Sequence, residues 1–192
     1  MITSLVGEYS LGAFMILWNR MKYMLSPQYD IYKAISKVVS GQVADIGFGT
    51  GFGMHLLAQN AEVTGYEIDA GSIDFAQSVF PYLTFKQGDI RKGIEGKFDF
   101  VIIIDVIEHI KQDKKALENV RAMLNPDGKL ILSTPNRLSR YRKSSNHIRE
   151  YAPKELEGIL KRIFFNKVEL RDYQLKPLVN QYENPIIAIC SM

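Results

Sequence analysis

The chain has 192 residues, 46% of them hydrophobic and 23% charged, which are the proportions of a globular protein and exclude the disordered and fibrous classes. This length predicts one domain, residues 1–192, because domains usually hold roughly 100–200 residues. A net charge of +3 does not by itself indicate binding to nucleic acid or to a membrane, and the single cysteine, Cys190, excludes an intrachain disulfide and a multi-cysteine zinc site, which fits a cytoplasmic protein.

The first forty residues have the spacing of two helices. Apolar side chains recur at helical intervals over residues 3–40, and Ser26-Pro27 interrupts them because the residue before a proline is driven out of the helical region. The apolar stretch Leu11–Trp18 follows no basic residue and is far shorter than the roughly 20 residues of a membrane span, so we interpret it as an amphipathic helix. The aromatic residues here could form a lid, part of the core or a dimer contact: Phe14, Trp18, Tyr23 and Tyr29.

From residue 41 onward, short apolar runs alternate with helical patterns. The predicted strands are Val43–Ile46, Glu62–Ile68, Tyr82–Lys86, Phe98–Ile104, Lys129–Ser133, Phe165–Tyr173 and Pro185–Cys190. The predicted helices are Met54–Gln59, Ile73–Phe80, Lys114–Leu124, which ends at a tight turn over residues 125–128, and Pro153–Ile163. The run at 98–104 has no alternation, which is typical of a central parallel strand. No helix separates the last two strands, so they should be antiparallel.

This order predicts an α/β fold with a mostly parallel sheet and helices on both faces. Residues 41–192 would form the catalytic core, and the helices of residues 1–40 would be added to it. Ligands of such sheets bind beyond the carboxyl ends of the strands, where the strand order reverses. We therefore expect the chemistry after the first, second, fourth and fifth strands.

A glycine-rich loop follows the first strand. It contains Gly47, Gly49 and Gly51. Such a loop lets a ligand approach the backbone, as a dinucleotide or S-adenosylmethionine would, or it is a plain turn that Asp45 caps. The G-x-G-x-x-G spacing of a dinucleotide site fails, because the sixth position from Gly47 is Phe52. Asp45 would repel a pyrophosphate but attract the ammonium of a methionine moiety, which favours S-adenosylmethionine.

Acidic residues follow the next two strands. Glu67 lies 18 residues after Gly49, where a carboxylate can accept both ribose hydroxyls of an adenosine. Asp69 is a rival for this role, but a helix cap is its more typical use. After the third strand, Asp89 could accept a hydrogen bond from an adenine amino group while Ile90 packs on the ring; the alternative for Asp89 is a plain loop residue.

Together these segments resemble class I S-adenosylmethionine-dependent methyltransferases. The resemblance rests on D-I-G-F-G-T-G at 45–51, G-Y-E-I-D at 65–69, G-D-I at 88–90 and F-D-F-V-I-I-I-D-V-I-E-H-I at 98–110, and it covers roughly Gln42 to Ser133. Asn125-Pro126-Asp127-Gly128 is similar to the family's L-x-P-G-G turn, with Asp127 replacing one glycine. The resemblance implies a Rossmann-like, seven-stranded sheet of order 3-2-1-4-5-7-6 with strand seven antiparallel, and S-adenosylmethionine as the cofactor.

The fourth strand ends at a cluster that could handle the methyl acceptor. His109 could deprotonate an acceptor hydroxyl, since an imidazole titrates near neutrality. The D-x-x-E-H run of Asp105, Glu108 and His109 resembles the E-x-x-E-H motif of ubiquinone-pathway O-methyltransferases and of small-RNA 3′-terminal 2′-O-methyltransferases, where the acids and histidine can hold a divalent ion. His147 lies where the RNA enzymes have a further histidine ligand. Glu108, His109 and His147 are therefore the candidate catalytic residues and the candidate metal ligands.

Hydrogen bonding within the loop is the favoured alternative to a metal, because Asp105 is one methylene shorter than the glutamate of that motif. We assign Asp105 instead to the methionine part of the cofactor. The segment Arg137–Arg149 holds five basic residues and could bind an anionic acceptor with the help of Tyr141, although a solvated loop is the simpler interpretation.

The sequence thus predicts an enzyme that methylates a small or medium-sized acceptor, with oxygen favoured over nitrogen or carbon. A non-catalytic S-adenosylmethionine-binding module is the main alternative, followed by a nicotinamide oxidoreductase. A nucleic-acid acceptor is not expected. The oligomeric state stays open.

Overall fold

The computed structural model describes residues 11–141, 143–164 and 167–191. The strands are β1 (Gln42–Ile46), β2 (Glu62–Glu67), β3 (Thr84–Gln87), β4 (Phe98–Ile104), β5 (Leu124–Thr134), β6 (Lys167–Arg171) and β7 (Ile186–Ser191). The helices are α1 (Leu11–Met24), α2 (Pro27–Ile35), α3 (Phe52–Leu57), α4 (Ala70–Val79), α5 (Asp113–Met123) and α6 (Pro153–Phe164), with a 3₁₀ turn η1 at Ile107–His109. None of the helices that the structure describes is both long and apolar enough to cross a membrane.

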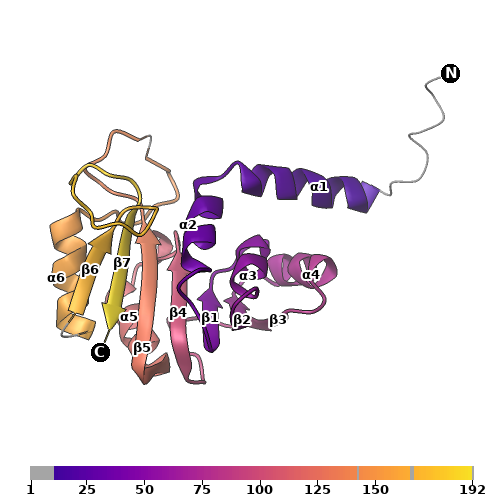
Figure 1. Ribbon diagram of the computed structural model, residues 1–192, viewed down its shortest axis with the longest axis horizontal. Helices are drawn as coiled ribbons and strands as arrows, with labels where there is room; N and C mark the ends of the chain where they lie inside the picture. The colour runs from indigo at the N-terminus through magenta and orange to yellow at the C-terminus, as the bar shows by residue number, and fades with distance from the viewer. Residues whose placement is uncertain (1–10, 142, 165–166, 192) are drawn as a thin grey trace.

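All seven strands form one sheet of order β3-β2-β1-β4-β5-β7-β6 (Figure 1). Neighbours from β3 to β5 are parallel, and β7 runs antiparallel to both β5 and β6. The predicted strand order and the antiparallel seventh strand are therefore confirmed. The chain leaves β1 toward β2 and β3, then returns to pair β4 on the other side of β1, so the order reverses between β1 and β4.

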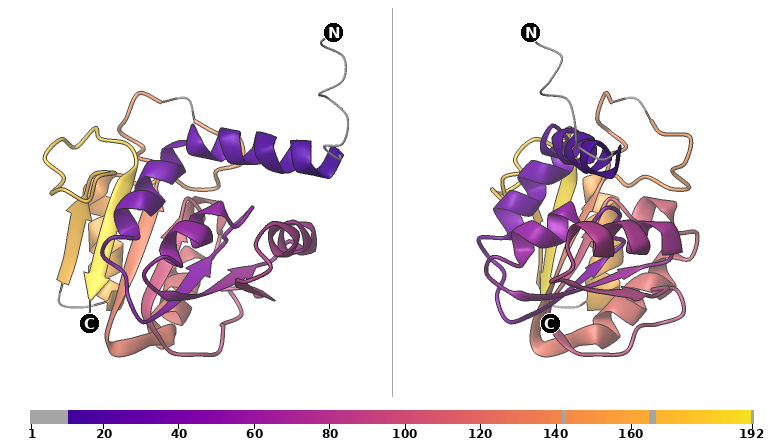
Figure 2. Two further views of the ribbon diagram at one scale, coloured as in Figure 1. Left: turned by 45° about the vertical axis from the view of Figure 1, so that its right-hand side comes forward. Right: turned by 90° about the vertical axis from the view of Figure 1, so that its right-hand side faces the viewer.

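The sheet separates two hydrophobic cores. Helices α5 and α6 cover one face through residues such as Leu117, Val120 and Leu160. Helices α2 and α3 cover the other face, where Ile31, Ile35 and Leu57 are buried, and α4 adds Ala76 (Figure 2). Successive side chains of the central strand β4 enter alternate cores, as the unalternated apolar run predicted. Burying each large apolar side chain contributes roughly 1.5–3 kcal/mol, so the two cores fix the strand ends on which the site is built.

One predicted turn is part of a strand. Residues 125–128 belong to β5, which pairs Leu124 with Phe98 and then Lys129 with Phe100, so the extra residues form an irregular bulge. The side chain of Asn125 donates to Asp99, and a side chain at Gly128 would lie 2.9 Å from the carbonyl oxygen of Phe98. These contacts between strands hold the segment in the sheet. The other predicted bounds differ by up to a few residues, and residues 165–166 of the predicted sixth strand lie outside the described residues.

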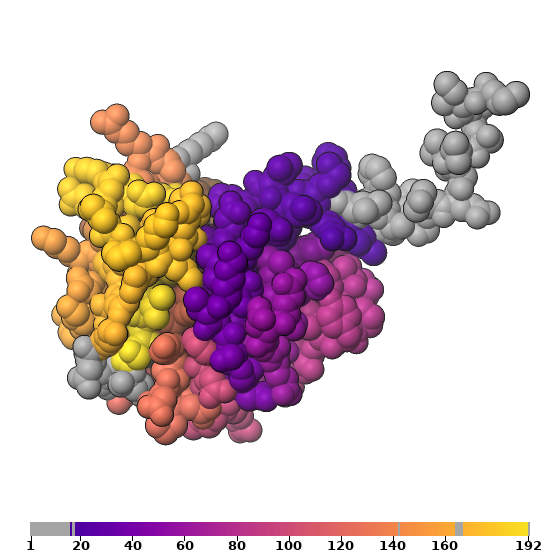
Figure 3. All heavy atoms as spheres, viewed as in Figure 1, coloured from indigo at the N-terminus to yellow at the C-terminus, as the bar shows by residue number. Residues whose placement is uncertain are grey.

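The N-terminal helices meet at Ser26-Pro27, as predicted. Helix α2 packs on the sheet beside α3, and in the space-filling view its indigo atoms lie against the purple atoms of α3 (Figure 3). Helix α1 and the connections after β5 and β6 lie at the end of the molecule to which the parallel strands point (Figures 1 and 2). Tyr23 stacks on Phe52 with ring centroids 5.6 Å apart, whereas Trp18 is exposed. The side chain of Phe14 lies outside the described residues.

Candidate active site

A cavity of about 130 Å³ opens at the carboxyl ends of β1, β2 and β4, beside the point where the strand order reverses. Its walls include Gly47, Glu67, Asp89, Ile90 and His109. The sequence predicted the first four of these as cofactor-binding residues and His109 as a catalytic residue. The fold therefore brings four predicted cofactor residues and one predicted acceptor residue to the same hollow. The other predicted cofactor residues do not line it: Asp45, Gly49, Gly51 and Asp105.

The glycine loop has a backbone that residues with side chains rarely adopt. Gly47, Gly49 and Gly51 have φ angles of 72°, 55° and 79°. A Cβ atom at Gly47 would lie 2.5 Å from a methyl group of Val106, whereas at Gly49 it would meet no atom within 4 Å. The loop therefore presses against the segment after β4 at its first glycine and faces open space at its second. Gly51 then begins α3.

Glu67 joins this loop to the end of β2. One carboxylate oxygen accepts a hydrogen bond from the backbone N–H of Gly49 at 3.2 Å, and the other accepts from the N–H groups of Ile68 and Asp69 at 2.7 and 3.3 Å. Asp69 itself caps α4 by accepting from Ser72 at 2.7 Å. Of the two candidates for the ribose contact, Asp69 is therefore the helix cap, as predicted, and Glu67 lines the cavity.

Asp89 has a partner that the sequence did not indicate. Arg91 donates to both of its carboxylate oxygens at 2.8 Å, and this contact lowers the pKa of Asp89. An adenine amino group would have to share these oxygens with Arg91. Ile90 is buried in the core and lines the cavity, so its predicted position beside a ring is compatible with the fold.

Asp45 is completely buried at the end of β1. The hydroxyl of Tyr32 donates to its two oxygens at 2.9 and 3.1 Å. Burial raises the pKa of Asp45 to about 7, the hydrogen bond from Tyr32 lowers it, and the charge of Glu67 raises it. Sequence reasoning missed Tyr32, because the residue belongs to a helical apolar pattern with no polar motif around it.

Asp105 follows β4 in the left-handed region of the backbone, with a φ of 52°. Ser133 donates to one oxygen of its carboxylate at 2.6 Å, and the amide of Gln28 donates to the other at 2.8 Å. Gln28 was also missed, since it lies 77 residues away in the sequence. Helix α2 therefore contacts both carboxylates that the sequence assigned to the methionine part of the cofactor.

The three candidate catalytic residues come together. Glu108, His109 and His147 each place one ligand atom within 4.8 Å of the others. Glu108 is fully buried, with one oxygen accepting from Thr134 at 3.2 Å and the other, Oε1, without a hydrogen-bond partner. Burial raises the pKa of Glu108 to about 8, and the charge of Asp105 adds to this. The group can therefore hold or release a proton near neutral pH.

Both histidine rings are oriented by acceptors. Nδ1 of His109 lies 2.9 Å from the carbonyl oxygen of Asn146, and Nδ1 of His147 lies 2.7 Å from a carboxylate oxygen of Glu150. A carbonyl or a carboxylate can only accept, so each Nδ1 carries the hydrogen. In the neutral rings, each Nε2 then keeps a lone pair that can take a proton or bind a cation.

The basic loop is partly structural. Arg149 pairs with Asp113 and Glu155, at 2.7 and 2.8 Å, and Arg137 also pairs with Glu155. The N–H groups of Ile148 and Arg149 donate to the carbonyl oxygen of Glu108, which anchors the loop beside the candidate catalytic residues. Arg140 and Lys143 are exposed, and Arg142 lies outside the described residues. Arg137 and Arg149 are thus engaged in ion pairs that stabilise the loop, which leaves fewer positive charges for an anionic acceptor.

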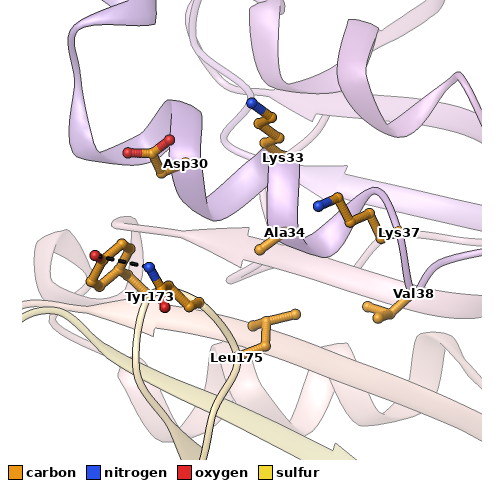
Figure 4. A pocket seen from close by; sticks show the side chains of 8 residues that line it. Asp30, Lys33, Ala34, Lys37, Val38, Tyr173 and Leu175 are labelled. Carbon is orange, nitrogen blue, oxygen red and sulfur yellow. Dashed lines mark hydrogen bonds between the residues drawn. The ribbon is translucent and has the colours of Figure 1, made fainter.

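A larger hollow of about 490 Å³ lies elsewhere, between α2 and the connection after β6. Figure 4 shows Lys33 of α2 and Lys37 just after it on one side of this hollow and Tyr173 and Leu175 on the other. None of the predicted site residues lines this hollow, so its size alone does not make it the active site.

Comparison with known proteins gives the family. A family model described as a methyltransferase domain matches residues 38–173, more than half of the chain. A ubiquinone biosynthesis O-methyltransferase of Rickettsia canadensis is 28% identical over 127 residues, 63% of this chain and 52% of the relative. A probable S-adenosylmethionine-dependent methyltransferase of Mycolicibacterium smegmatis is 26% identical over 113 residues, 57% of this chain and 44% of the relative. The chain spans about half the length of these curated relatives.

The fold agrees with that of solved methyltransferase structures. A structure from Thermotoga maritima, described as an S-adenosylmethionine-dependent methyltransferase and possible histamine N-methyltransferase, has a TM-score of 0.72 at 17% identity and covers 92% of this chain and 96% of its own. The seven-stranded sheet, the glycine loop at the end of β1 and the match over more than half of the chain lead to one conclusion. This protein belongs to the methyltransferase-domain family.

Proposed function

We propose that this protein transfers the methyl group of S-adenosylmethionine to an oxygen atom of a small or medium-sized acceptor. The observation that carries the proposal is the arrangement of Glu108, His109 and His147 at the mouth of the cofactor cavity, where His109 is itself a wall residue. The ubiquinone biosynthesis O-methyltransferase among the relatives supports an oxygen acceptor. The Thermotoga neighbour, described as a possible N-methyltransferase, is the reason to test nitrogen as well.

The residues fit the cofactor chemically. Gly49 leaves open space where a side chain would otherwise stand, beside the carboxylate of Glu67, which would accept from the ribose hydroxyls. Among the described residues, no cationic side chain forms an ion pair with the buried Asp45, so this carboxylate can pair with the ammonium of the cofactor. Ile90 would pack on the adenine ring. When bound, the cofactor supplies an electrophilic methyl group on a positively charged sulfur.

The chain would then orient the acceptor and remove its proton. Displacement at a methyl group requires the nucleophile, the methyl and the sulfur to lie in line, so alignment and exclusion of water contribute most of the rate. His109 or His147 would accept the hydroxyl proton on Nε2, because their Nδ1 atoms are held by Asn146 and Glu150. Such general-base catalysis typically contributes about 10²–10⁴-fold.

The same three residues could hold a divalent cation. Glu108 offers an unpaired oxygen and each histidine offers one nitrogen, and a cation at this place would lower the pKa of an acceptor hydroxyl. Chelation separates the two versions of the proposal. Activity that survives a chelator assigns the proton to a histidine, whereas activity that is lost and then restored by Mg²⁺ or Zn²⁺ assigns the three residues to a metal.

Two exposed basic side chains beside the candidate catalytic residues bear on the chemistry of the acceptor. Arg140 and Lys143 are exposed on the loop that carries His147, and we propose that they attract an anionic group of the acceptor. The free thiol of Cys190 is buried, which agrees with a cytoplasmic setting.

The test uses cofactor labelled in the methyl group and a panel of phenols, catechols, amines and carboxylic acids. We expect label in a hydroxyl-bearing acceptor as an O-methyl product, identified by mass spectrometry, and a loss of about 100-fold in His109→Ala. His55→Ala is the matched control, because His55 contacts Tyr82 away from the cavity. Label found only on nitrogen or carbon, or full activity in His109→Ala, would reject the oxygen proposal.

A further inference from the structure

Helix α2 donates two side-chain hydrogen bonds to carboxylates at the carboxyl ends of β1 and β4. Gln28 and Tyr32 are four residues apart, hence on the same face of the helix. Gln28 donates to Asp105, and Tyr32 donates to Asp45. We propose that α2 completes the methionine subsite, with Tyr32 and Gln28 as positioning residues that hold Asp45 and Asp105 for the positively charged groups of the cofactor. This inference rests on the assignment of those two carboxylates to the cofactor under the proposed function.

The position of Tyr32 is fixed by packing against α3. Its side chain is buried in the core on this face of the sheet, to which Ile31 and Ile35 of the same helix also belong. At Gly53, a Cβ atom would lie 2.5 Å from Cζ of the Tyr32 ring, so the ring lies directly on the backbone of α3. Helix α3 begins immediately after the glycine loop. Tyr32 therefore connects α2, the glycine loop and the end of β1.

The hydrogen bond from Tyr32 acts on a carboxylate in an anionic surrounding. Asp45 is faced by the hydroxyl groups of Tyr32 from α2 and Tyr23 from α1 and by Glu67 at the end of β2, while Asp105 after β4 acts on Tyr32. Burial and the charge of Glu67 both favour the protonated acid, and only the donated hydrogen bond favours the ionised form. The cofactor's ammonium needs the ionised form. Tyr32 thus keeps Asp45 competent to bind at neutral pH.

Gln28 has the corresponding role at Asp105. The backbone of Asp105 is in the left-handed region, which costs a residue with a side chain roughly 1–2 kcal/mol. Its carboxylate is held from one side by Ser133 of β5 and from the other by Gln28. Because the amide of Gln28 is neutral, it fixes the direction of the carboxylate without neutralising its charge. The negative charge stays available to a cationic ligand.

The test is the dissociation constant of S-adenosylmethionine as a function of pH, measured by isothermal titration from pH 5.5 to 9. In the wild type the affinity falls as the pH decreases through about 7, because Asp45 takes up a proton. In Tyr32→Phe we expect this midpoint to rise by about one pH unit, so that the ionised fraction at pH 7 falls from about a half to about a tenth and Kd rises about five-fold. A residue that only stabilises the fold would not move the midpoint.

Two variants control the interpretation. Tyr29→Phe makes the same chemical change on the same helix, at a residue whose ring contacts Tyr23, and we expect it to leave the midpoint unchanged. Asp45→Asn removes the titrating group, so we expect a weak affinity without this midpoint, and Tyr32→Phe should not alter the pH dependence in that background. Gln28→Ala should raise Kd a few-fold at every pH without moving the midpoint, since it acts on Asp105.

The outcomes separate the inference from the proposed function. A midpoint in Tyr32→Phe equal to that of the wild type, while Asp45→Asn binds weakly, would overturn the role of Tyr32 and leave the site assignment standing. An unchanged Kd in Gln28→Ala would overturn the role of Gln28. Wild-type affinity in Asp45→Asn would overturn the assignment of Asp45 and the inference together. Circular dichroism confirms that each variant is folded before it is titrated.

Discussion

The donor side and the acceptor side of this site are held by different kinds of contact. On the donor side, Glu67 receives hydrogen bonds from three backbone N–H groups, two of them within two residues of it. On the acceptor side, Glu108 accepts a hydrogen bond from Thr134, which is 26 residues away in the sequence. His109 donates one to the carbonyl oxygen of Asn146, which is 37 residues away. The part of the donor side around Glu67 is thus largely a local motif, while the acceptor side depends on how the chain after β5 folds back. A fold that keeps its donor motif can therefore change its acceptor by changing one connection.

The largest effect that would sharpen this comparison is expected on the acceptor side. Glu108→Gln keeps the shape of the side chain but can no longer take up or release a proton, so we expect methyl transfer to fall by about 10²-fold in an assay with the acceptor identified from the panel. Glu118→Gln, at an exposed position on α5, should retain wild-type activity. Equal activity of the two variants would mean that Glu108 has only a structural role.

How far the sequence predicts the two sides follows from the same distinction. The glycine loop, the cap at Asp69 and the unalternated strand β4 could be predicted, because each depends on residues close together in the chain. Tyr32, Gln28 and Arg91 could not be identified as partners of Asp45, Asp105 and Asp89. In the first two pairs the contact arises only when α2 packs on the sheet.

Glu108, His109 and His147 are an intermediate case. Their juxtaposition was expected from the resemblance of the motif after the fourth strand, and the structure brings them together. The acceptors that set their tautomers, Asn146 and Glu150, were not predicted, because they depend on the path of the connection after β5. The same path places Arg137 and Arg149 in ion pairs, whereas the sequence favoured a solvated loop over one that binds an anionic acceptor.

On the donor side, two glycines provide a matched pair of variants. Gly47→Ala introduces a Cβ atom 2.5 Å from Val106 in a left-handed backbone, so we expect a loss of about 3 kcal/mol in the free energy of unfolding and at least a ten-fold weaker affinity for S-adenosylmethionine. Gly49→Ala meets no protein atom and should lose only about 1 kcal/mol. Chemical denaturation measures the difference. Equal losses would show that the contact with Val106 does not constrain the loop.

A pH effect on stability is expected from Asp45 in the cofactor-free protein. Its pKa is raised from 3.8 to about 7, so between these values the folded state binds more protons than the unfolded state, and stability falls as the pH rises. Asp45→Asn removes this contribution and should be about 2–4 kcal/mol more stable than the wild type at pH 8, with little difference at pH 4. Denaturant titrations at the two pH values check this. A variant that is less stable at pH 8 would contradict the assigned protonation.

The smallest effect distinguishes anchored from free charges in the basic loop. Arg149→Ala removes the only ion-pair partner that the described residues give the buried Asp113 and leaves it the hydroxyl of Tyr151 and the backbone N–H of Lys114, and we expect a loss of about 2 kcal/mol in stability. Arg140→Ala, at an exposed position of the same loop, should change stability by less than about 0.5 kcal/mol. Thermal unfolding of the two variants measures the contrast. An equal change in both would mean that the ion pairs of Arg149 do not hold the loop.

The central claim is that donor binding and acceptor chemistry reside in different groups of residues, which meet at His109 on the cavity wall. Titration of S-adenosylmethionine into Glu108→Gln beside the wild type tests it most directly. We predict dissociation constants that agree within about two-fold, since Glu108 is not part of the cavity wall that holds the cofactor. A ten-fold weaker affinity in Glu108→Gln would contradict the division and place Glu108 in the donor site.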